Sequence, residues 1–275
     1  MKSHAISICK PDNGYINEDA AIARDNLIAV SDGAGGGGLF AERWSAYLLN
    51  NLPDTPVHNV EELDTWIGRI WEPYYDECEE DAKRLGGLSL DKFYDEGSYA
   101  TLAAAWISSD TECQWISFGD SVVFHYNLHT KLLEHSFGTL ADFDNPPYLI
   151  NCKDELQKEG FNNGTFNIDA DSVVFVASDA LAHYIIMMYE TANTDKYEQE
   201  LSTAESYHSK NSNYIQMAKA MGRVNFERDI ISKLINTINH PTNFKRHIQS
   251  LIRKGLIAYD DYSIACFILK KRGWQ

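Results

Sequence analysis

Acidic residues recur where short apolar runs of the sequence begin or end. In "VSDGAGGGGLF" (residues 30–40), Asp32 closes an apolar run and is followed at once by a glycine-rich segment and the start of a helical pattern. The other acidic positions in this context are Glu18–Asp19, Asp120, Asp179 and Asp260–Asp261. Taken singly, each is explained as a turn or helix-cap residue. Taken together, they indicate chemistry if the fold brings these strand ends to one place.

Five or six carboxylates at one place would form a strongly acidic cluster. Like charges a few ångströms apart raise one another's pKa or require bound cations. Carboxylate, backbone carbonyl and water are the ligands that Mg²⁺ and Mn²⁺ prefer, and soft or imidazole ligands are missing from these stretches. Two such ions about 3.5–4 Å apart can bridge a water, lower its pKa and stabilise in-line attack on phosphorus. The pattern therefore predicts a binuclear Mn²⁺ or Mg²⁺ site that hydrolyses phosphate esters.

The glycine-rich segment itself admits a second interpretation, because glycine-rich turns that open helices often bind phosphate through backbone N–H groups. It lacks the lysine and spacing of a P-loop, and it matches no dinucleotide-binding fingerprint. The nine histidines are scattered without HxH or HExxH spacing, which favours surface or packing roles. His183, four residues after Asp179, is expected near the rim of the site, with packing as its favoured role.

The elements that must position the carboxylates are short strands in the N-terminal half, joined by tight turns such as "ARDN" (23–26) and "GDS" (119–121). The apolar runs that predict these strands cover residues 4–9, 19–23, 27–32, 99–108, 113–118, 121–127 and 131–137. Helical spacing occurs over residues 39–52 and 60–85. Strands linked in this way favour antiparallel sheets, with Asp120 at a hairpin tip.

The second half predicts a buried strand over 172–178, a helix over 180–190, a helical stretch over 225–254 that Pro241 interrupts, and a last strand over 262–271. The polar residues 190–215 are expected to form a loop or mobile insert, and residues 138–166 a flap over the site. No repeat or linker divides the chain, so residues 1–275 are expected to form a single domain.

The composition of the chain argues against some classes of binding partner. Forty Asp and Glu against 24 Lys and Arg give a formal charge of −16, which repels nucleic acid and anionic lipid. No apolar stretch is long enough to span a membrane, and the first residues lack the apolar core of a secretory signal, so a cytoplasmic location is expected. A phosphorylated substrate would be repelled as well, unless bound cations reverse the local field.

The order of motifs resembles the metal-dependent protein phosphatases, the protein phosphatase 2C family, in its bacterial form. The matching segments are "NEDA" (17–20), "VSDGAGG" (30–36), "GSYATLAAAWI" (97–107), "FGDSVV" (118–123), "VVFVASDALAHYI" (173–185) and "DDYSIACFIL" (260–269). They occur in the family's order and span almost the whole chain. The resemblance implies an α+β fold, a four-layer α-β-β-α sandwich of two antiparallel sheets flanked by helices, with a dinuclear Mn²⁺ or Mg²⁺ site at one end.

The resemblance also implies roles for individual positions. Asp32 would bridge both metal ions, the Gly33 carbonyl would ligate one of them, and Asp179 and Asp260 would complete the other. Glu18 would orient metal-bound water, and Asp120 would help to hold a third, weaker ion. The catalytic set would thus be Asp32, Glu18 and Asp179. Asp261 stands where the family usually has Asn, so Asp260 is the better ligand of that pair.

Two departures bear on function. Family members usually carry an arginine four residues before the motif glutamate, where it grips the substrate phosphate in a bidentate manner. Here that position is Gly14, and Lys10, Arg24 and Arg43 are the cations that could substitute. The family's eukaryotic histidine after Asp-Gly is replaced by Ala34, as in bacterial members.

Three functions follow. The first is a Mn²⁺- or Mg²⁺-dependent phosphatase of serine/threonine phosphoproteins that opposes a kinase. The second is a catalytically inactive regulatory or binding protein on the same fold, and the third a phosphohydrolase acting on a small phosphate ester.

Overall fold

The computed structural model describes residues 2–11, 14–206 and 210–268, and omits the side chains of 210, 211 and 268. The strands are β1 (Lys2–Ile8), β2 (Ala20–Ala23), β3 (Leu27–Ser31), β4 (Tyr99–Ala100), β5 (Leu102–Ser109), β6 (Glu112–Phe118), β7 (Val122–Asn127), β8 (Leu133–His135), β9 (Ile150–Asn151), β10 (Phe161–Asn167), β11 (Ser172–Ala177) and β12 (Tyr262–Ile268). The α-helices are α1 (Ala41–Asn51), α2 (Val60–Leu85), α3 (Leu88–Glu96), α4 (Asp179–Ala192), α5 (Thr194–Ser206), α6 (Lys210–Ala220), α7 (Ser232–Thr237) and α8 (Pro241–Arg253). Short 3₁₀ turns η1 (Leu140–Asp144) and η2 (Lys158–Gly160) and a π-helical turn η3 (Glu227–Ile231) complete the set.

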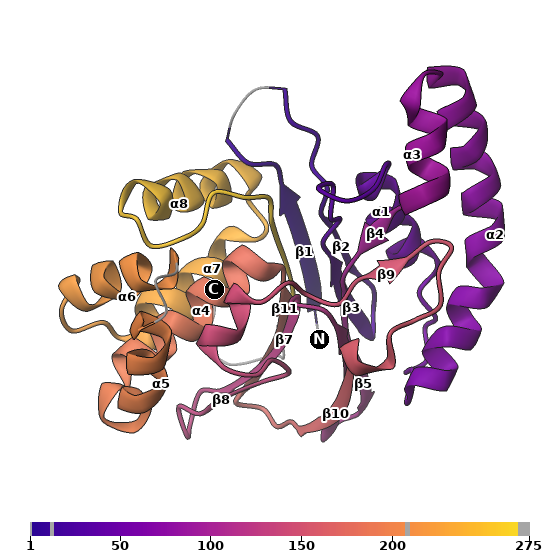
Figure 1. Cartoon of the computed structure of the whole chain (residues 1–275). Coiled ribbons are helices and arrows are strands. Elements are labelled where there is room, and N and C mark those ends of the chain that lie inside the picture. The colour runs from indigo at the N-terminus through magenta and orange to yellow at the C-terminus, as the bar shows by residue number, and fades with distance from the viewer. Residues whose placement is uncertain (1, 12–13, 207–209, 269–275) are drawn as a thin grey trace.

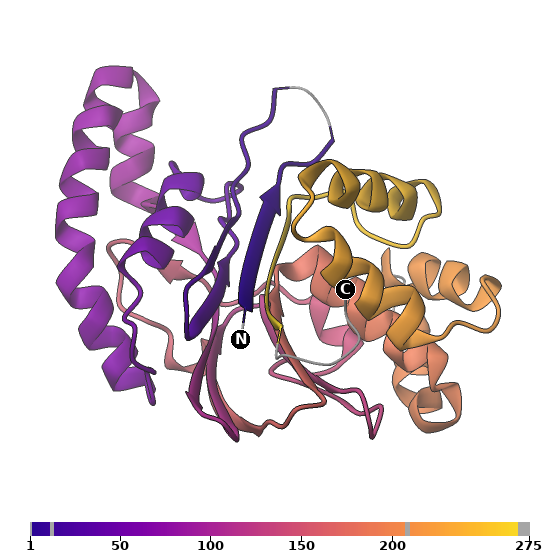
Figure 2. The same ribbon diagram turned by 180° about the vertical axis from the view of Figure 1, so that it is seen from behind.

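Two antiparallel sheets form the centre of the molecule (Figure 1). One has the strand order β1-β12-β11-β7-β8 and the other β10-β6-β5-β3-β2, while β4 and β9 form a separate pair. Helices α1 to α3 cover the outer face of the second sheet and α4 to α8 that of the first, as the view from behind also shows (Figure 2). The predicted four-layer α-β-β-α sandwich is confirmed.

The continuous apolar runs of the sequence are explained by strands that are covered on both faces. In β3, Leu27 and Ala29 pack toward helices α1 and α2, whereas Ile28 and Val30 pack between the sheets. All residues of β11 are buried as well. Because neither face of a central strand is exposed to solvent, its sequence does not alternate between apolar and polar residues.

The turn "GDS" is not the hairpin that the sequence predicts. Strand β6 lies in one sheet and β7 in the other, so Gly119 and Asp120 form a crossover between the sheets. Gly119 has φ +91°, and a Cβ there would lie 2.7 Å from the Tyr148 carbonyl oxygen. The tight turn was correctly expected, but its strands diverge into different layers.

Two further expectations are wrong in detail. Residues 190–215, for which the sequence predicts a loop or mobile insert, hold the end of α4, all of α5 and the first part of α6, while residues 207–209 lie outside the described residues. Leu201, Ala204, Ile215 and Ala218 are buried against the α4 layer, and this packing stabilises helices whose remaining residues are largely polar. The expected flap 138–166 is largely integrated into the fold, since β9 pairs with β4 and β10 pairs with β6.

One buried carboxyl in the helical layer makes stability depend on pH. Glu190 of α4 is 4% exposed, and its Oε2 has no hydrogen-bond partner among the described residues. Burial, followed by the negative charge of Glu200, raises the pKa of Glu190 to about 7. Since the folded-state pKa exceeds the unfolded one, this group favours folding at low pH, and that contribution is lost as pH rises from about 4.5 through 7.

We therefore expect Glu190→Gln to raise the free energy of unfolding at pH 8 by on the order of 2 kcal/mol, with little gain at pH 5. Urea denaturation at both pH values measures the difference. Glu198→Gln, on the exposed face of α5, serves as the control and should change neither value. An equal gain for Glu190→Gln at both pH values would contradict the assignment.

Candidate active site

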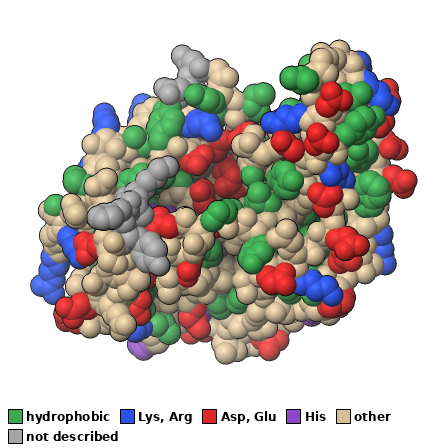
Figure 3. Space-filling model, viewed as in Figure 1, with side chains coloured by type: hydrophobic (Ala, Val, Ile, Leu, Met, Phe, Trp, Pro, Cys, Tyr) green, Lys and Arg blue, Asp and Glu red, His purple; other side chains and the backbone are tan. Residues whose placement is uncertain are grey.

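The fold brings the predicted acidic residues to one end of the sandwich. Asp32 follows β3, Asp179 follows β11, Asp260 precedes β12, and Asp120 lies in the β6–β7 crossover. Glu18 and Asp19 directly precede β2. Neighbouring strands run antiparallel, so a strand that ends here lies beside one that begins here. Figure 3 shows acidic side chains gathered in a hollow in the upper centre of this face.

A short series of buried hydrogen bonds holds Asp32 in position. Its backbone N–H donates to Thr101 Oγ1 at 3.1 Å, and its carbonyl accepts from the N–H of Thr101 at 2.8 Å. The Thr101 hydroxyl is in turn 2.7 Å from that of Ser121, next to Asp120. These hydrogen bonds join β3, the start of β5 and the start of β7, and they hold Asp32 and Asp120 on the same side of the fold. No sequence pattern singles out Thr101 and Ser121 as site residues.

The glycine-rich segment lies tightly against Glu18. A Cβ on Gly33 would lie 2.6 Å from the carbonyl oxygens of both Glu18 and Ala41. A Cβ on Gly35 would lie 1.8 Å from Glu18 Oε1. The Gly33 N–H donates to the Glu18 carbonyl at 3.1 Å, and the Ser45 hydroxyl donates to the same carbonyl at 2.6 Å. These glycines therefore let the backbone and side chain of Glu18 lie directly against residues 33–35.

Asp19 is a site residue that the sequence predictions did not include among the ligands. It is 8% exposed, and its Oδ2 has no hydrogen-bond partner among the described residues. Burial raises the pKa of Asp19 to about 7, although the hydroxyls of Ser178 and Ser263 oppose this shift. In the sequence, Asp19 is visible only as the second acidic residue of "NEDA" (17–20). The fold is needed to show that its side chain points inward.

The carboxylates act strongly on one another. Burial, then the charges of Asp19, Asp179, Asp120 and Asp260, raise the pKa of Asp32 well above its ordinary value. Burial, then Asp120, Asp260 and Asp19, do the same for the pKa of Asp179. Burial and the charge of Asp260 raise the pKa of Asp120 to about 6. The predicted acidic cluster is therefore present, and it carries more negative charge than its protein neighbours neutralise.

Asp261 has a different role from Asp260. It is 3% exposed, and its two carboxylate oxygens accept the backbone N–H groups of Lys10 at 2.8 Å and Glu18 at 2.7 Å. It therefore joins the start of β12 to the segment between β1 and β2. The side chain of Asp260 is 47% exposed and faces the Lys10 ammonium. With the more exposed side chain of the pair, Asp260 stays the predicted ligand.

Lys10 is a cation that lies beside this cluster. Its Nζ is 3.9 Å from Asp260 Oδ1 and lies over the ring of Tyr15, 5.0 Å from its centroid. Burial acts to lower the pKa of Lys10, but the charges of Asp261, Asp260 and Glu18 outweigh it and raise the pKa. The ammonium is therefore charged at neutral pH.

The residues fit hard divalent cations by three criteria. The inward-facing groups are carboxylate oxygens, which hard cations prefer as ligands. One of them, Asp19 Oδ2, is buried without a partner among the described residues. Burial, and then repulsion between neighbouring carboxylates, raises the pKa of Asp32 and Asp179. Among the described residues, however, no three His, Cys, Asp or Glu side chains already surround a single point as a closed metal site. The ligand assignments of Asp32, Gly33, Asp179, Asp260, Glu18 and Asp120 therefore remain predictions.

A hollow of about 320 Å³ adjoins Asp179 and Asp260. Its walls include Phe143 of η1, Tyr214 of α6 and His183 of α4. The His183 ring makes edge-to-face contacts with both of those rings, with centroids 5.4 and 5.6 Å away. His183 thus lies at the rim as predicted, in an aromatic wall. Of the expected flap 138–166, Phe143 and Asp144 reach this hollow.

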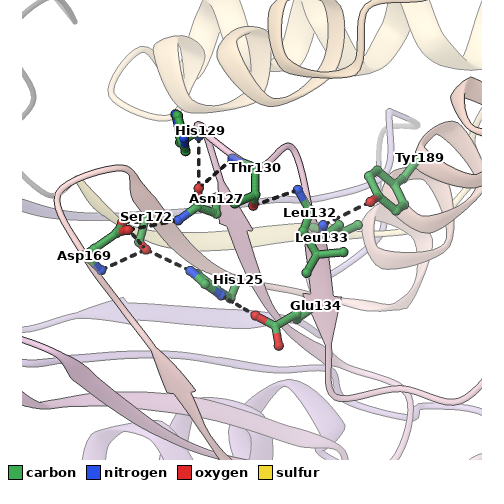
Figure 4. A network of polar contacts seen from close by, with 10 residues as sticks. All are labelled: His125, Asn127, His129, Thr130, Leu132, Leu133, Glu134, Asp169, Ser172 and Tyr189. Carbon is green, nitrogen blue, oxygen red and sulfur yellow. Dashed lines mark hydrogen bonds and ion pairs between the residues drawn. The ribbon is translucent and has the colours of Figure 1, made fainter.

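A second polar network, around His125, serves packing (Figure 4). Its Nδ1 is 2.7 Å from the Glu134 carboxylate, and its Nε2 is 2.9 Å from the Ser172 hydroxyl. Ser172 Oγ also donates to Asp169 Oδ1 at 2.9 Å. Because Ser172 is 3% exposed and its hydrogen is directed to Asp169, it is no nucleophile. The network joins β7, β8 and β11.

Comparison with family models gives no match, and comparison with curated proteins gives none either. Solved structures do match over nearly the whole chain. The catalytic domain of the serine/threonine phosphatase PstP, in complex with two manganese ions, is 16% identical with a TM-score of 0.53 over 96% of each chain. PstP/Ppp of Mycobacterium tuberculosis is 15% identical (TM-score 0.54, covering 98% of this chain and 99% of that one). Stp1 of Staphylococcus aureus is 11% identical (TM-score 0.53, 98% and 95%).

The chain has the fold of bacterial serine/threonine phosphatases. The fold that the sequence resemblance implied is thus confirmed, while identities of 11–16% leave activity to be argued from the site. Among the described helices, none combines the length and apolar character needed to cross a bilayer.

Proposed function

We propose that this chain is a metal-dependent phosphatase of serine/threonine phosphoproteins that reverses the action of a kinase. One observation carries the proposal: carboxylates from separate chain segments converge at one end of a fold shared with known serine/threonine phosphatases. Burial, and then the charges of the neighbouring carboxylates, raises the pKa of Asp32 and Asp179. A dinuclear Mn²⁺ or Mg²⁺ site would supply positive charge to this cluster. A bacterial phosphatase of the same fold was solved with two manganese ions.

In this proposal the chain's own residues have distinct tasks. Asp32, the Gly33 carbonyl, Asp179 and Asp260 would hold the two ions. Glu18 and Asp19 would hold and orient water beside Asp32, and Asp120 would help to hold a third, weaker ion. When bound, the ions supply an activated water as nucleophile and neutralise the charge of the phosphoryl group.

The aromatic hollow beside Asp179 and Asp260 favours a protein substrate. Its volume of about 320 Å³ accommodates a residue that flanks the phosphorylated one, and the aromatic side chains of Phe143, His183 and Tyr214 line it. A small phosphate ester would leave this space empty. The hollow thus supports phosphoproteins over small esters.

The direct test is hydrolysis of p-nitrophenyl phosphate with and without Mn²⁺. We expect turnover that depends on Mn²⁺ in the parent and falls by at least about 10³-fold in Asp179→Asn, because this carboxylate would be lost as a ligand. Asp171→Asn, in the turn before β11, is the matched control and should retain parental activity. Parental turnover no higher than that of Asp179→Asn would support a non-catalytic binding protein instead. A phosphopeptide panel then separates protein from small-ester substrates.

A further inference from the structure

The sequence offers three cations in place of the arginine missing at Gly14, and the structure excludes two of them. Arg24 donates to the carbonyls of Leu49 and Leu52 and to the Asp54 carboxylate, at the C-terminal end of α1. Arg43 is held by Glu77 and Asp81 of α2, at 2.8 and 2.6 Å. Both guanidinium groups are thus engaged by acceptors that are not members of the carboxylate cluster.

Both the backbone and the side chain of Lys10 contact residues of the carboxylate cluster. Its backbone N–H donates to Asp261, the residue that also accepts the N–H of Glu18. Its side chain is 19% exposed and passes over the ring of Tyr15, which leaves the ammonium facing Asp260. The backbone contact therefore fixes Lys10 to Asp261, the same residue that positions Glu18.

The Lys10 ammonium lies close to the carboxylate cluster but does not form a hydrogen bond with Asp260. Its distance of 3.9 Å from Asp260 Oδ1 exceeds a hydrogen bond, and no other described residue accepts a hydrogen bond from this ammonium, so its N–H donors can turn toward another acceptor. In a chain with a formal charge of −16, a cation at the rim of the cluster also attracts an approaching anion.

We propose that Lys10 binds the phosphoryl group of the substrate, in the role that the missing arginine would have had. The inference rests on the proposed function, since it takes the phosphoryl group to lie beside ions held by Asp32, Asp179 and Asp260. A lysine contacts phosphate as a compact charge rather than as a bidentate fork, so its contribution lies in affinity more than in orientation.

The test measures binding of inorganic phosphate to the full chain loaded with Mn²⁺, by isothermal titration calorimetry, independently of turnover. We expect Lys10→Met to weaken phosphate binding by about tenfold or more and Lys10→Arg by less than about threefold. Lys83→Met, which removes an exposed lysine of α2, is the matched control and should change nothing. Lys10→Gln serves in place of Lys10→Met if that variant does not fold.

Binding of Mn²⁺ supplies a second readout. Loss of a cation beside Asp260 should leave Mn²⁺ affinity equal or higher, whereas a general structural defect would lower it. Unchanged phosphate affinity in Lys10→Met overturns the role of Lys10 and leaves the phosphatase proposal intact. A parent that binds phosphate with Mn²⁺ but hydrolyses neither p-nitrophenyl phosphate nor phosphopeptides overturns the function, while the dissociation constants still decide on Lys10. A Mn²⁺-loaded parent that binds no phosphate overturns both.

Discussion

Replacing Asp32 with Asn is expected to stabilise the metal-free protein and to abolish its stabilisation by Mn²⁺. In the absence of ions, Asp32 is crowded by the charges of Asp19, Asp179 and Asp120, and an uncharged amide of similar shape relieves this repulsion. We expect a gain on the order of 1–3 kcal/mol at pH 8. With ions, the sign reverses, because Asp32 is the proposed ligand of both.

Thermal unfolding with and without Mn²⁺ measures both effects. At a concentration of about 100 times its dissociation constant, a ligand that binds the folded state adds about 2.7 kcal/mol, which corresponds to a Tm increase of roughly 5–10 °C in a chain of this size. The parent should show this increase and Asp32→Asn should not. Asp25→Asn, in the exposed β2–β3 turn, should behave as the parent. A full Mn²⁺ response in Asp32→Asn would remove Asp32 from the metal site.

The sequence predicted the place of the carboxylates well, because that information is local. An acidic residue at the end of an apolar run stays at the end of a strand whatever the strand's neighbours are. Which of two adjacent acidic residues faces inward is not local information. Asp19 is buried because Ser178 and Ser263, more than 150 residues away in the chain, are its neighbours, whereas Glu18 lies over Gly35.

Elements that depend on tertiary contacts were predicted less well. The turn at Asp120 has the local sequence of a hairpin, but whether β6 and β7 pair or separate into two sheets is decided by the layers around them. Helices α5 and α6 have few apolar residues, and those few gain their helical stability from packing on α4. Likewise, the sequence could not show which of Lys10, Arg24 and Arg43 replaces the missing arginine, because the choice depends on the tertiary contacts of all three.

The remaining large effect concerns the glycine that follows Asp32. A Cβ on Gly33 would lie 2.6 Å from the carbonyl oxygens of Glu18 and Ala41, so Gly33→Ala must move either the β2 side or the start of α1. We expect Gly33→Ala to lower the free energy of unfolding by about 2–4 kcal/mol. Gly36→Ala is the matched control, since a Cβ there meets no atom within 4 Å, and should lie within about 0.5 kcal/mol of the parent.

Chemical denaturation of both variants gives the stability difference, and Mn²⁺-dependent Tm shifts show whether the site follows it. Equal stability of the two variants would contradict the close approach of Gly33 to Glu18. A Gly33→Ala protein that regains parental stability at high Mn²⁺ would show that ions can draw the displaced carboxylates back together. One that is destabilised and also unresponsive to Mn²⁺ would show that this glycine sets the distance between Glu18 and Asp32 on which the metal site depends.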